Sequence, residues 1–204
     1  MSITVEPPEF IFPDKLLFSR DTNFHEYKDD CIEWMRQYSF KHSTWSKSNC
    51  GGYQSPDQFY LEESFAPFLN RFCEHLRASI DAYANPEDCA IEEIDNIRIS
   101  NMWFNFNYQH SYNTTHVHPG AVLSGVLFLH VPENSGELIF EADNQWAHAL
   151  VNSDSSKGIS PEEGGLILFP AYLPHRVSAN ENENNEMRVS MAFNLADLPI
   201  PPVS

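Results

Sequence analysis

Positive charge is scarce in this sequence of 204 residues. Lysine and arginine together number 12, against 29 aspartates and glutamates, which gives a formal net charge of −17. Such an excess of negative charge repels phosphate backbones and anionic lipid surfaces. The composition therefore argues against a general nucleic-acid binder and against a protein of the membrane surface.

Long apolar runs are also missing. No stretch approaches the roughly 18 consecutive apolar residues of a membrane span. Residues 1–8 lack the basic region followed by an apolar region that is typical of a signal peptide. We therefore expect a cytoplasmic protein with no membrane partner.

Cysteine is sparse, whereas aromatic residues are abundant. The four cysteines form no Cys-x-x-Cys pair, so free buried thiols are the simplest interpretation. In contrast, 42% of the residues are hydrophobic and 13% are aromatic. This is enough apolar surface to exclude disorder for most of the chain and to predict one domain over residues 1–204.

Helical spacing of apolar residues marks the first part of the chain, residues 1–90. It predicts one helix from Asp21 or Thr22 to about Tyr38, and a longer one from Leu61 to about Asn85. The proline-rich opening to Ser19 is expected to lie extended across the domain. Because this opening segment is also rich in aromatic residues, it could support a homodimer.

Beyond Ile91 the apolar period changes from 3.6 to 2. We expect short strands over residues 97–108, 122–131, 137–140, 166–169, 175–178 and 188–195. Residues 141–163 are expected to form a long loop, and residues 180–186 a solvated hairpin tip. The chain is thus predicted to be α+β but mainly β, with helices packed on one sheet of a jelly roll spanning residues 91–197.

Three histidines carry the main chemical signal. His116 and His118 are two residues apart, and on an extended strand such residues point to the same face, so both imidazoles can reach one metal ion. Histidines on strand faces also occur as ordinary hydrogen-bonding residues. His175, which follows an apolar strand and a proline-containing turn, favours a metal site with open coordination positions.

The last predicted strand has one wholly apolar face and one face of polar or small residues. If the apolar face packs under the helices, Arg188 and Ser190 point into the barrel. A buried guanidinium without an anion is costly, so it needs either an internal aspartate or glutamate or an anionic ligand. In the second case the arginine clamps a carboxylate cosubstrate, assisted by the serine hydroxyl.

These residues resemble those that bind metal and cosubstrate in the iron(II)- and 2-oxoglutarate-dependent oxygenases. The closest likeness is to a group of such oxygenases from phages and bacteria. It is carried by Asn-Thr-Thr-His-Val-His-Pro-Gly-Ala-Val-Leu-Ser-Gly-Val (113–126), Val-Pro-Glu-Asn-Ser-Gly (131–136) and Phe-Pro-Ala-Tyr-Leu-Pro-His (169–175). The resemblance covers residues 97–195 well and the N-terminal half loosely, and it implies a double-stranded β-helix.

The resemblance also implies roles for these histidines. His116 and His175 take the places of the two histidine ligands of iron(II), and His118 stands where most of the superfamily has aspartate or glutamate. Asp143 or Glu137 could supply a carboxylate instead, and His110 is a spare candidate. Phe128 stands where relatives often have a tyrosine that touches the cosubstrate.

The implied activity is that of a dioxygenase that uses iron(II), 2-oxoglutarate and molecular oxygen to hydroxylate a substrate of unknown identity. Arg188 and Ser190 would bind the distal carboxylate of 2-oxoglutarate, and Asn107 could hydrogen-bond to the same molecule. Two alternatives remain. One is a cupin-type metal-dependent dioxygenase or isomerase that does not use 2-oxoglutarate, and the other is a non-catalytic jelly roll that binds a ligand.

Overall fold

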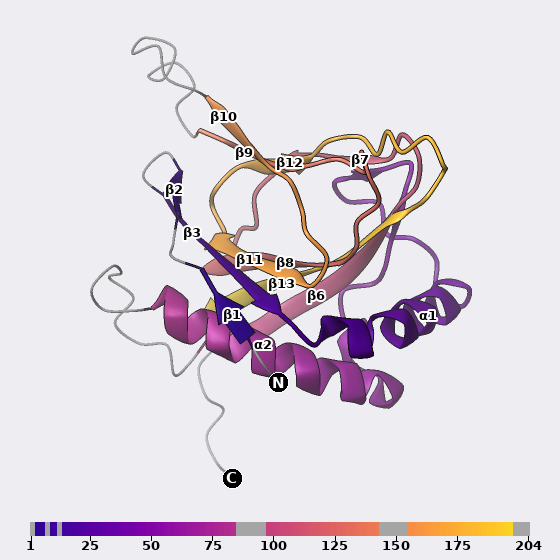
Figure 1. The fold of residues 1–204 in the computed structure, drawn as a ribbon, viewed down its shortest axis with the longest axis horizontal. Coiled ribbons are helices and arrows are strands. Elements are labelled where there is room, and N and C mark those ends of the chain that lie inside the picture. Colours follow the sequence, from indigo (N-terminus) through magenta and orange to yellow (C-terminus); the bar gives the residue numbers. More distant parts are fainter. Residues whose placement is uncertain (1–2, 7–8, 12–13, 85–96, 143–154, 198–204) are drawn as a thin grey trace.

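The computed structural model describes residues 3–6, 9–11, 14–84, 97–142 and 155–197. Two antiparallel β-sheets face each other, and two α-helices lie beneath the larger sheet, on the side away from the smaller one (Figure 1). This is the expected mainly β architecture, with helices packed on one sheet.

The larger sheet has eight strands in the order β1-β3-β11-β8-β13-β6-β5, with β2 paired to β3. Every strand pair in it is antiparallel. Their bounds in sheet order are β1 Ile3–Val5, β3 Asp14–Asp21, β11 Gly165–Pro170, β8 Leu123–His130, β13 Arg188–Asp197, β6 Ile97–Asn107, β5 Tyr53–Gln54 and, beside β3, β2 Glu9–Ile11.

The smaller sheet has five strands in the order β10-β9-β12-β7-β4. These strands are β10 Ser156–Ile159, β9 Leu138–Glu141, β12 His175–Val177, β7 Tyr112–His116 and β4 Asn49–Cys50. The chain passes between the sheets repeatedly, as in a jelly roll. Strands β7 and β12 lie side by side in the centre of this sheet, and each has one of the three candidate histidines at its end.

The helices are α1 Lys28–Ser39 and α2 Ala66–Tyr83. The first begins later than Asp21 or Thr22, the predicted start. Asp21 ends β3, where its carboxylate accepts hydrogen bonds from the backbone N–H of Asn23 and the hydroxyl of Tyr27. These bonds hold a turn and a short 3₁₀ helix, Phe24–Glu26, ahead of α1.

Two apolar cores lie on the two faces of the larger sheet. The outer core joins the sheet to the helices, and the apolar face of β13 packs into it as the alternation predicts. The inner core fills one end of the space between the sheets with Leu16, Phe128, Leu138, Phe140, Ile167, Phe169 and Leu173. The polar face of β13 therefore points into the remaining space between the sheets, where the candidate site lies.

The segment before α1 contributes more to the fold than the sequence predicts. Strand β3 pairs with β11 inside the larger sheet, where an extended segment lying across the domain was expected. Its side chains alternate: Leu16 packs in the inner core, and Leu17 in the outer core. The flanking prolines Pro7, Pro8 and Pro13 obscure this short run of period 2 in the sequence.

Two predicted loops also differ. Residues 141–163 include the end of β9 and the strand β10, and residues 143–154 lie outside the described part of the chain. Asn180 and Asn182 are buried, so the prediction of a wholly solvated tip is wrong. Their amide groups donate to the carbonyls of Asn107, Glu186 and Glu133, which satisfies polar side chains that burial alone would make unfavourable.

Within the described residues, no helix is long and apolar enough to cross a membrane. Three cysteines in this part of the chain are free thiols: Cys31 is buried, Cys50 is half-buried and Cys73 is exposed. The expectation of buried thiols is thus correct for Cys31 and wrong for Cys73. Cys89 lies outside the described residues.

Replacing Gly125 with alanine should destabilise the protein by about 1–3 kcal/mol, as overpacking of a core commonly does. A Cβ at this position would lie 2.3 Å from the Phe193 ring and 2.8 Å from the carbonyl oxygen of Ile167. Urea unfolding measures the difference. Val122→Ala at an exposed site just before the same strand is the control, with an expected change within about 0.5 kcal/mol. Equal stability of Gly125→Ala and the wild type would contradict this packing.

A buried histidine should make the fold sensitive to acid. Burial lowers the pKa of His75 from 6.5 to about 4, and its Nε2 lies 2.9 Å from the Ser19 hydroxyl oxygen. The imidazole of residue 75 binds a proton more readily in the unfolded chain than in the folded one. The contribution of neutral His75 to the free energy of unfolding is therefore fully present above pH 6.5 and is lost as the pH falls towards 4. The free energy of unfolding of His75→Gln should fall less steeply across this window. Parallel pH profiles for the variant and the wild type would count against the assignment.

Candidate active site

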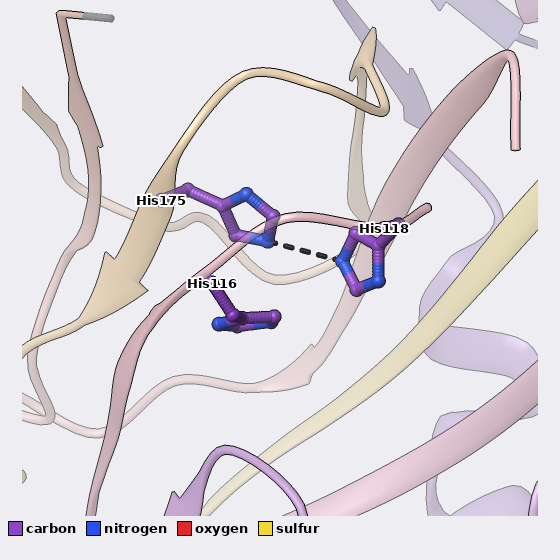
Figure 2. Close-up of side chains that lie close together, drawn as sticks. All are labelled: His116, His118 and His175. Atoms are coloured by element: carbon purple, nitrogen blue, oxygen red, sulfur yellow. Dashed lines mark hydrogen bonds between the residues drawn. The ribbon is translucent and has the colours of Figure 1, made fainter. Parts of the chain in front are cut away.

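His116, His118 and His175 converge between the sheets (Figure 2). His116 ends β7 and is paired in register with His175, which begins β12. His118 lies two residues beyond the strand, in a turn held by a hydrogen bond of 2.9 Å from its backbone N–H to the carbonyl of Ala171. Their candidate ligand atoms all lie within 4.8 Å of one another. The predicted convergence is therefore present, although a turn rather than a strand places His118.

Backbone carbonyls fix the orientation of two of these rings. The Nδ1 of His116 lies 2.7 Å from the carbonyl oxygen of Thr114, and the Nδ1 of His175 lies 2.9 Å from that of Leu173. A carbonyl only accepts, so each Nδ1 carries the proton and each Nε2 presents a lone pair. In metal-binding histidines, the ring nitrogen that does not bind the metal usually donates a hydrogen bond, and a backbone carbonyl is a common acceptor.

The three imidazoles are uncharged at neutral pH. Burial, together with the neighbouring imidazoles, lowers the pKa of His175 to about 3 and that of His118 to about 4. Burial also lowers the pKa of His116. The Nε2 atoms of His118 and His175 are only 3.2 Å apart, joined by the dashed line in Figure 2. Neutral nitrogen donors held this close fit a metal ion of the imidazole-binding kind, such as iron or zinc.

Arg188 carries a buried positive charge towards the same space. Its side chain is 1% exposed, its Nη1 donates to the carbonyl of Gly136 at 3.3 Å, and its Nε has no partner. Burial lowers the pKa of the guanidinium to about 10, which still leaves it charged at neutral pH. No carboxylate of the described residues forms an ion pair with it, so the first of the two alternatives, an internal aspartate or glutamate, is not found in that part of the chain.

One cavity brings the histidines and the arginine together. Its lining includes all three histidines, Arg188, Ser190 and Phe128. Ser190 is buried and is paired in register with Asn105 of β6. Asn105 also lines this cavity, and its buried Oδ1 has no hydrogen-bond partner. The cavity therefore has nitrogen donors for a metal at one end and an unpaired cation at the other.

Asn107 lies beside Arg188 in the register of β6 and β13. Its Nδ2 donates to Asn113 Oδ1 at 3.3 Å, and Asn113 in turn donates to the Ser48 hydroxyl at 3.2 Å. Ser48 Oγ lies 3.5 Å from His116 Nε2. A polar chain thus connects the arginine end of the site to the histidine end. The Oδ1 of Asn107 is buried without a partner.

The other residues considered from the sequence lie elsewhere. Glu137 accepts a hydrogen bond from Ser160 at 3.0 Å, and His110 is exposed in a turn with a positive φ of 66°. Neither belongs to the histidine cluster, which is the metal-capable group found among the described residues. Asp143 lies outside the described residues. Tyr172 is exposed and donates to Asp14, away from the cavity.

Sequence reasoning assigns no role to the segment 44–54. Trp45, Lys47 and Ser48 from this segment line a second cavity of about 480 Å³, which also contacts His116 and His118. A signal for this role is lacking in the sequence, because the segment has neither a regular period nor a metal-ligand spacing. Its position becomes visible only through its pairing with strands far along the chain.

Comparison with known proteins gives one family. Residues 101–194 match the family model described as "Putative 2OG-Fe(II) oxygenase". This segment runs from β6 to β13 and contains the three histidines, Arg188 and Ser190. The search of curated proteins found no match.

Solved structures with the same fold include several oxygenases. The α-ketoglutarate-dependent epimerase SnoN from nogalamycin biosynthesis has a TM-score of 0.65 at 13% identity, covering 90% of this chain and 77% of that one. A Trichoplax adhaerens prolyl hydroxylase has a TM-score of 0.63 at 13% identity, with 89% and 83% covered. HygX from Streptomyces hygroscopicus, solved with nickel and 2-oxoglutarate, has a TM-score of 0.55 at 10% identity, with 89% and 82% covered.

At these identities the neighbours establish the fold, the double-stranded β-helix, and the family match covers the part of it that holds the candidate site. The convergent histidines supply a group of ligands that fits iron. Over residues 101–194 the chain matches the family of 2OG-Fe(II) oxygenases, the oxidoreductases that use iron(II) and 2-oxoglutarate.

Proposed function

We propose that His116, His118 and His175 hold iron(II), and that Arg188 and Ser190, with Arg188 supported by Asn107, bind 2-oxoglutarate for the hydroxylation of a further substrate. The observation that carries this proposal is one cavity lined by three histidines and by a buried arginine that forms no ion pair with a carboxylate of the described residues. A keto acid with a second, distal carboxylate matches both ends. The structure of HygX with nickel and 2-oxoglutarate offers a precedent in the same fold.

Iron(II) with bound 2-oxoglutarate supplies oxidation of a substrate C–H bond by molecular oxygen, with decarboxylation of 2-oxoglutarate to succinate. The contribution of this chain is to bind, orient and exclude water. The carbonyls of Thr114 and Leu173 keep the proton on Nδ1 of His116 and His175, so that each Nε2 lone pair is available to a metal. Such preorganisation spares the site a rearrangement on binding.

Arg188 provides the distal carboxylate with its partner. A charge-assisted, bidentate hydrogen bond from a guanidinium is strong where water is excluded, and this side chain is almost completely buried. Ser190 lies two residues along the same strand face and adds a hydroxyl donor. The unpartnered Oδ1 of Asn107, opposite Arg188 in register, can accept from the guanidinium and hold it in place.

The third imidazole distinguishes this site from one with two histidines and a carboxylate. His118 is neutral, so an iron(II) site built from these three residues keeps one more positive charge than the usual set. The dianionic cosubstrate would partly balance that charge. We therefore expect metal binding to be weaker without 2-oxoglutarate and to tighten when both are present.

Iron(II) followed by 2-oxoglutarate, added without oxygen to metal-stripped protein, should give the weak visible charge-transfer band of the chelate. His175→Ala should abolish the band, because it removes one of three ligands and a backbone-fixed nitrogen. His25→Ala, at an exposed histidine far along the chain from the site, should keep it. Tight metal binding with no band in the wild type would favour a cupin-type enzyme, and no metal binding would leave only a ligand-binding barrel.

Arg188→Met should raise the 2-oxoglutarate concentration needed for half-maximal band intensity roughly tenfold or more, because it removes charged hydrogen bonds. Iron binding alone, measured by calorimetry, should change little. Arg176→Met, which breaks a partly exposed ion pair with Glu141, is the matched control and should leave the 2-oxoglutarate requirement unaltered. The same requirement in both variants would refute the proposed role of Arg188.

A further inference from the structure

The cavity of about 480 Å³ lies directly outside the histidine cluster. We call it the outer cavity, and the cavity that contains Arg188 the inner cavity. Four residues line both of them: Ser48, Trp103, His116 and His118. A molecule that fills the outer cavity therefore contacts two histidines, His116 and His118, that also line the inner cavity. The volume falls in the range of about 300–1,000 Å³ that is usual for small-molecule sites.

The outer wall of this cavity is built by residues 44–54, which are attached to both sheets. Strand β4 pairs with β7 of the smaller sheet, and β5 pairs with β6 of the larger sheet. Within the segment, the backbone N–H of Trp45 donates to the carbonyl of Gln54 at 2.9 Å. Thr114 of β7 donates to the carbonyl of Ser48 at the same distance. These bonds fix the wall in place against the site.

The polar side chains that line the outer cavity are mostly amides and hydroxyls. One lysine, Lys47, and one aspartate, Asp57, line the cavity, so its charged side chains balance. The uncharged polar residues of the lining are Ser48, Gln54, Asn101, Thr114 and Asn194. A primary amide or a hydroxyl both donates and accepts hydrogen bonds, which is also what an alcohol group does. This composition matches a neutral ligand with many hydroxyl groups.

Part of this hydrogen-bonding capacity is unused within the protein. Gln54 is 5% exposed, and its side-chain Oε1 has no hydrogen-bond partner. Asn194 accepts from the Ser124 hydroxyl at 2.7 Å through its Oδ1, which orients its amide NH₂ away from that contact. A buried amide without a partner is rare in proteins and is commonly explained by a group that binds there.

Two tryptophans supply flat apolar surfaces to the same cavity. Trp103 lies next to the His118 ring, with 5.5 Å between ring centroids. Trp45 is 40% exposed, and the Lys47 Nζ lies 5.6 Å from its ring centroid. The apolar faces suit C–H groups, and the amides suit hydroxyls at the rim of a ring. A saturated ring with several hydroxyl groups has both kinds of surface.

We propose that the primary substrate is a neutral, hydroxyl-rich ring compound, of the sugar or cyclitol class, bound between Trp45 and Trp103. This inference rests on the proposed function for the identity of the reaction, but the binding site itself does not require iron. Gln54 acts as a specificity-determining residue because its amide meets the hydroxyls of the ligand. Trp103 and Ser48 separate this ligand from 2-oxoglutarate.

Saturation-transfer NMR on the full chain, without metal and again with diamagnetic zinc(II), tests the ligand class. Sucrose, D-glucose and myo-inositol are the probes, and L-proline, L-glutamate and indole are the comparison compounds. The ring protons of at least one hydroxyl-rich probe should receive saturation. Trp45→Ala and Gln54→Ala should each reduce that signal at least fivefold. Phe40→Ala, at a strongly exposed aromatic residue outside the cavity, should leave it unchanged.

Several outcomes would overturn the substrate class. These are no saturation of any hydroxyl-rich probe, stronger saturation of an amino acid or of indole, or equal signals in the wild type, Trp45→Ala and Gln54→Ala. Asn101→Ala, at a half-buried residue of β6 that lines the same cavity, provides a third variant if either of the others fails to fold. If the protein forms the iron and 2-oxoglutarate chelate but binds none of the sugars, only this inference is refuted. If the protein binds sugar but forms no chelate with iron and 2-oxoglutarate, the proposed oxygenase activity is refuted and the proposed sugar-binding site stands.

Discussion

Arg188 brings a positive charge into the space between the two sheets, where no carboxylate among the described residues contacts it. A cation desolvated in this way is unfavourable unless an anion joins it. The surrounding strands nevertheless hold it there, because Val189 and Met191 on either side pack into the outer core and fix the direction of the strand face. The protein thus accepts a local cost in the free form that the proposed anion would remove. Under the proposed function, the position of the histidines relative to Arg188 would set the length of that anion.

The histidine end of the site depends on backbone geometry rather than on charged partners. Main-chain carbonyls orient His116 and His175, and the turn after β7 places His118. Burial keeps all three rings neutral, so they are ready to bind a metal without first losing protons. The inner apolar core, which includes Phe140 and Phe169, closes one side of the site and limits the access of water.

The sequence was informative where a side-chain pattern is local. The alternation along residues 188–195 correctly predicted which face of the last strand packs under the helices, and hence that Arg188 points inwards. The spacing of His116 and His118, with His175 after a turn, was sufficient to predict that the three meet. The resemblance to 2OG-Fe(II) oxygenases added a family, and residues 101–194 match the model of that family.

Features that arise from pairing between distant segments were not predictable in this way. Strand β3 has only eight residues between Pro13 and a turn, and its place in the sheet is decided by β11, more than a hundred residues away. The burial of Asn180 and Asn182 depends on carbonyls of other loops, which no local pattern encodes. The wall of the outer cavity was missed for the same reason, since β4 and β5 have two residues each.

The attachment of residues 44–54 to both sheets has a consequence for how the protein can change. His116 and His175 are paired directly in register, so their spacing does not depend on this segment. The segment supplies much of the outer cavity but none of the three histidines or Arg188. Substitutions there at positions other than Ser48 can therefore reshape what the barrel recognises while leaving the three histidines and Arg188 in place. The fold therefore keeps the three histidines and Arg188 separate from a segment that can vary to bind different substrates.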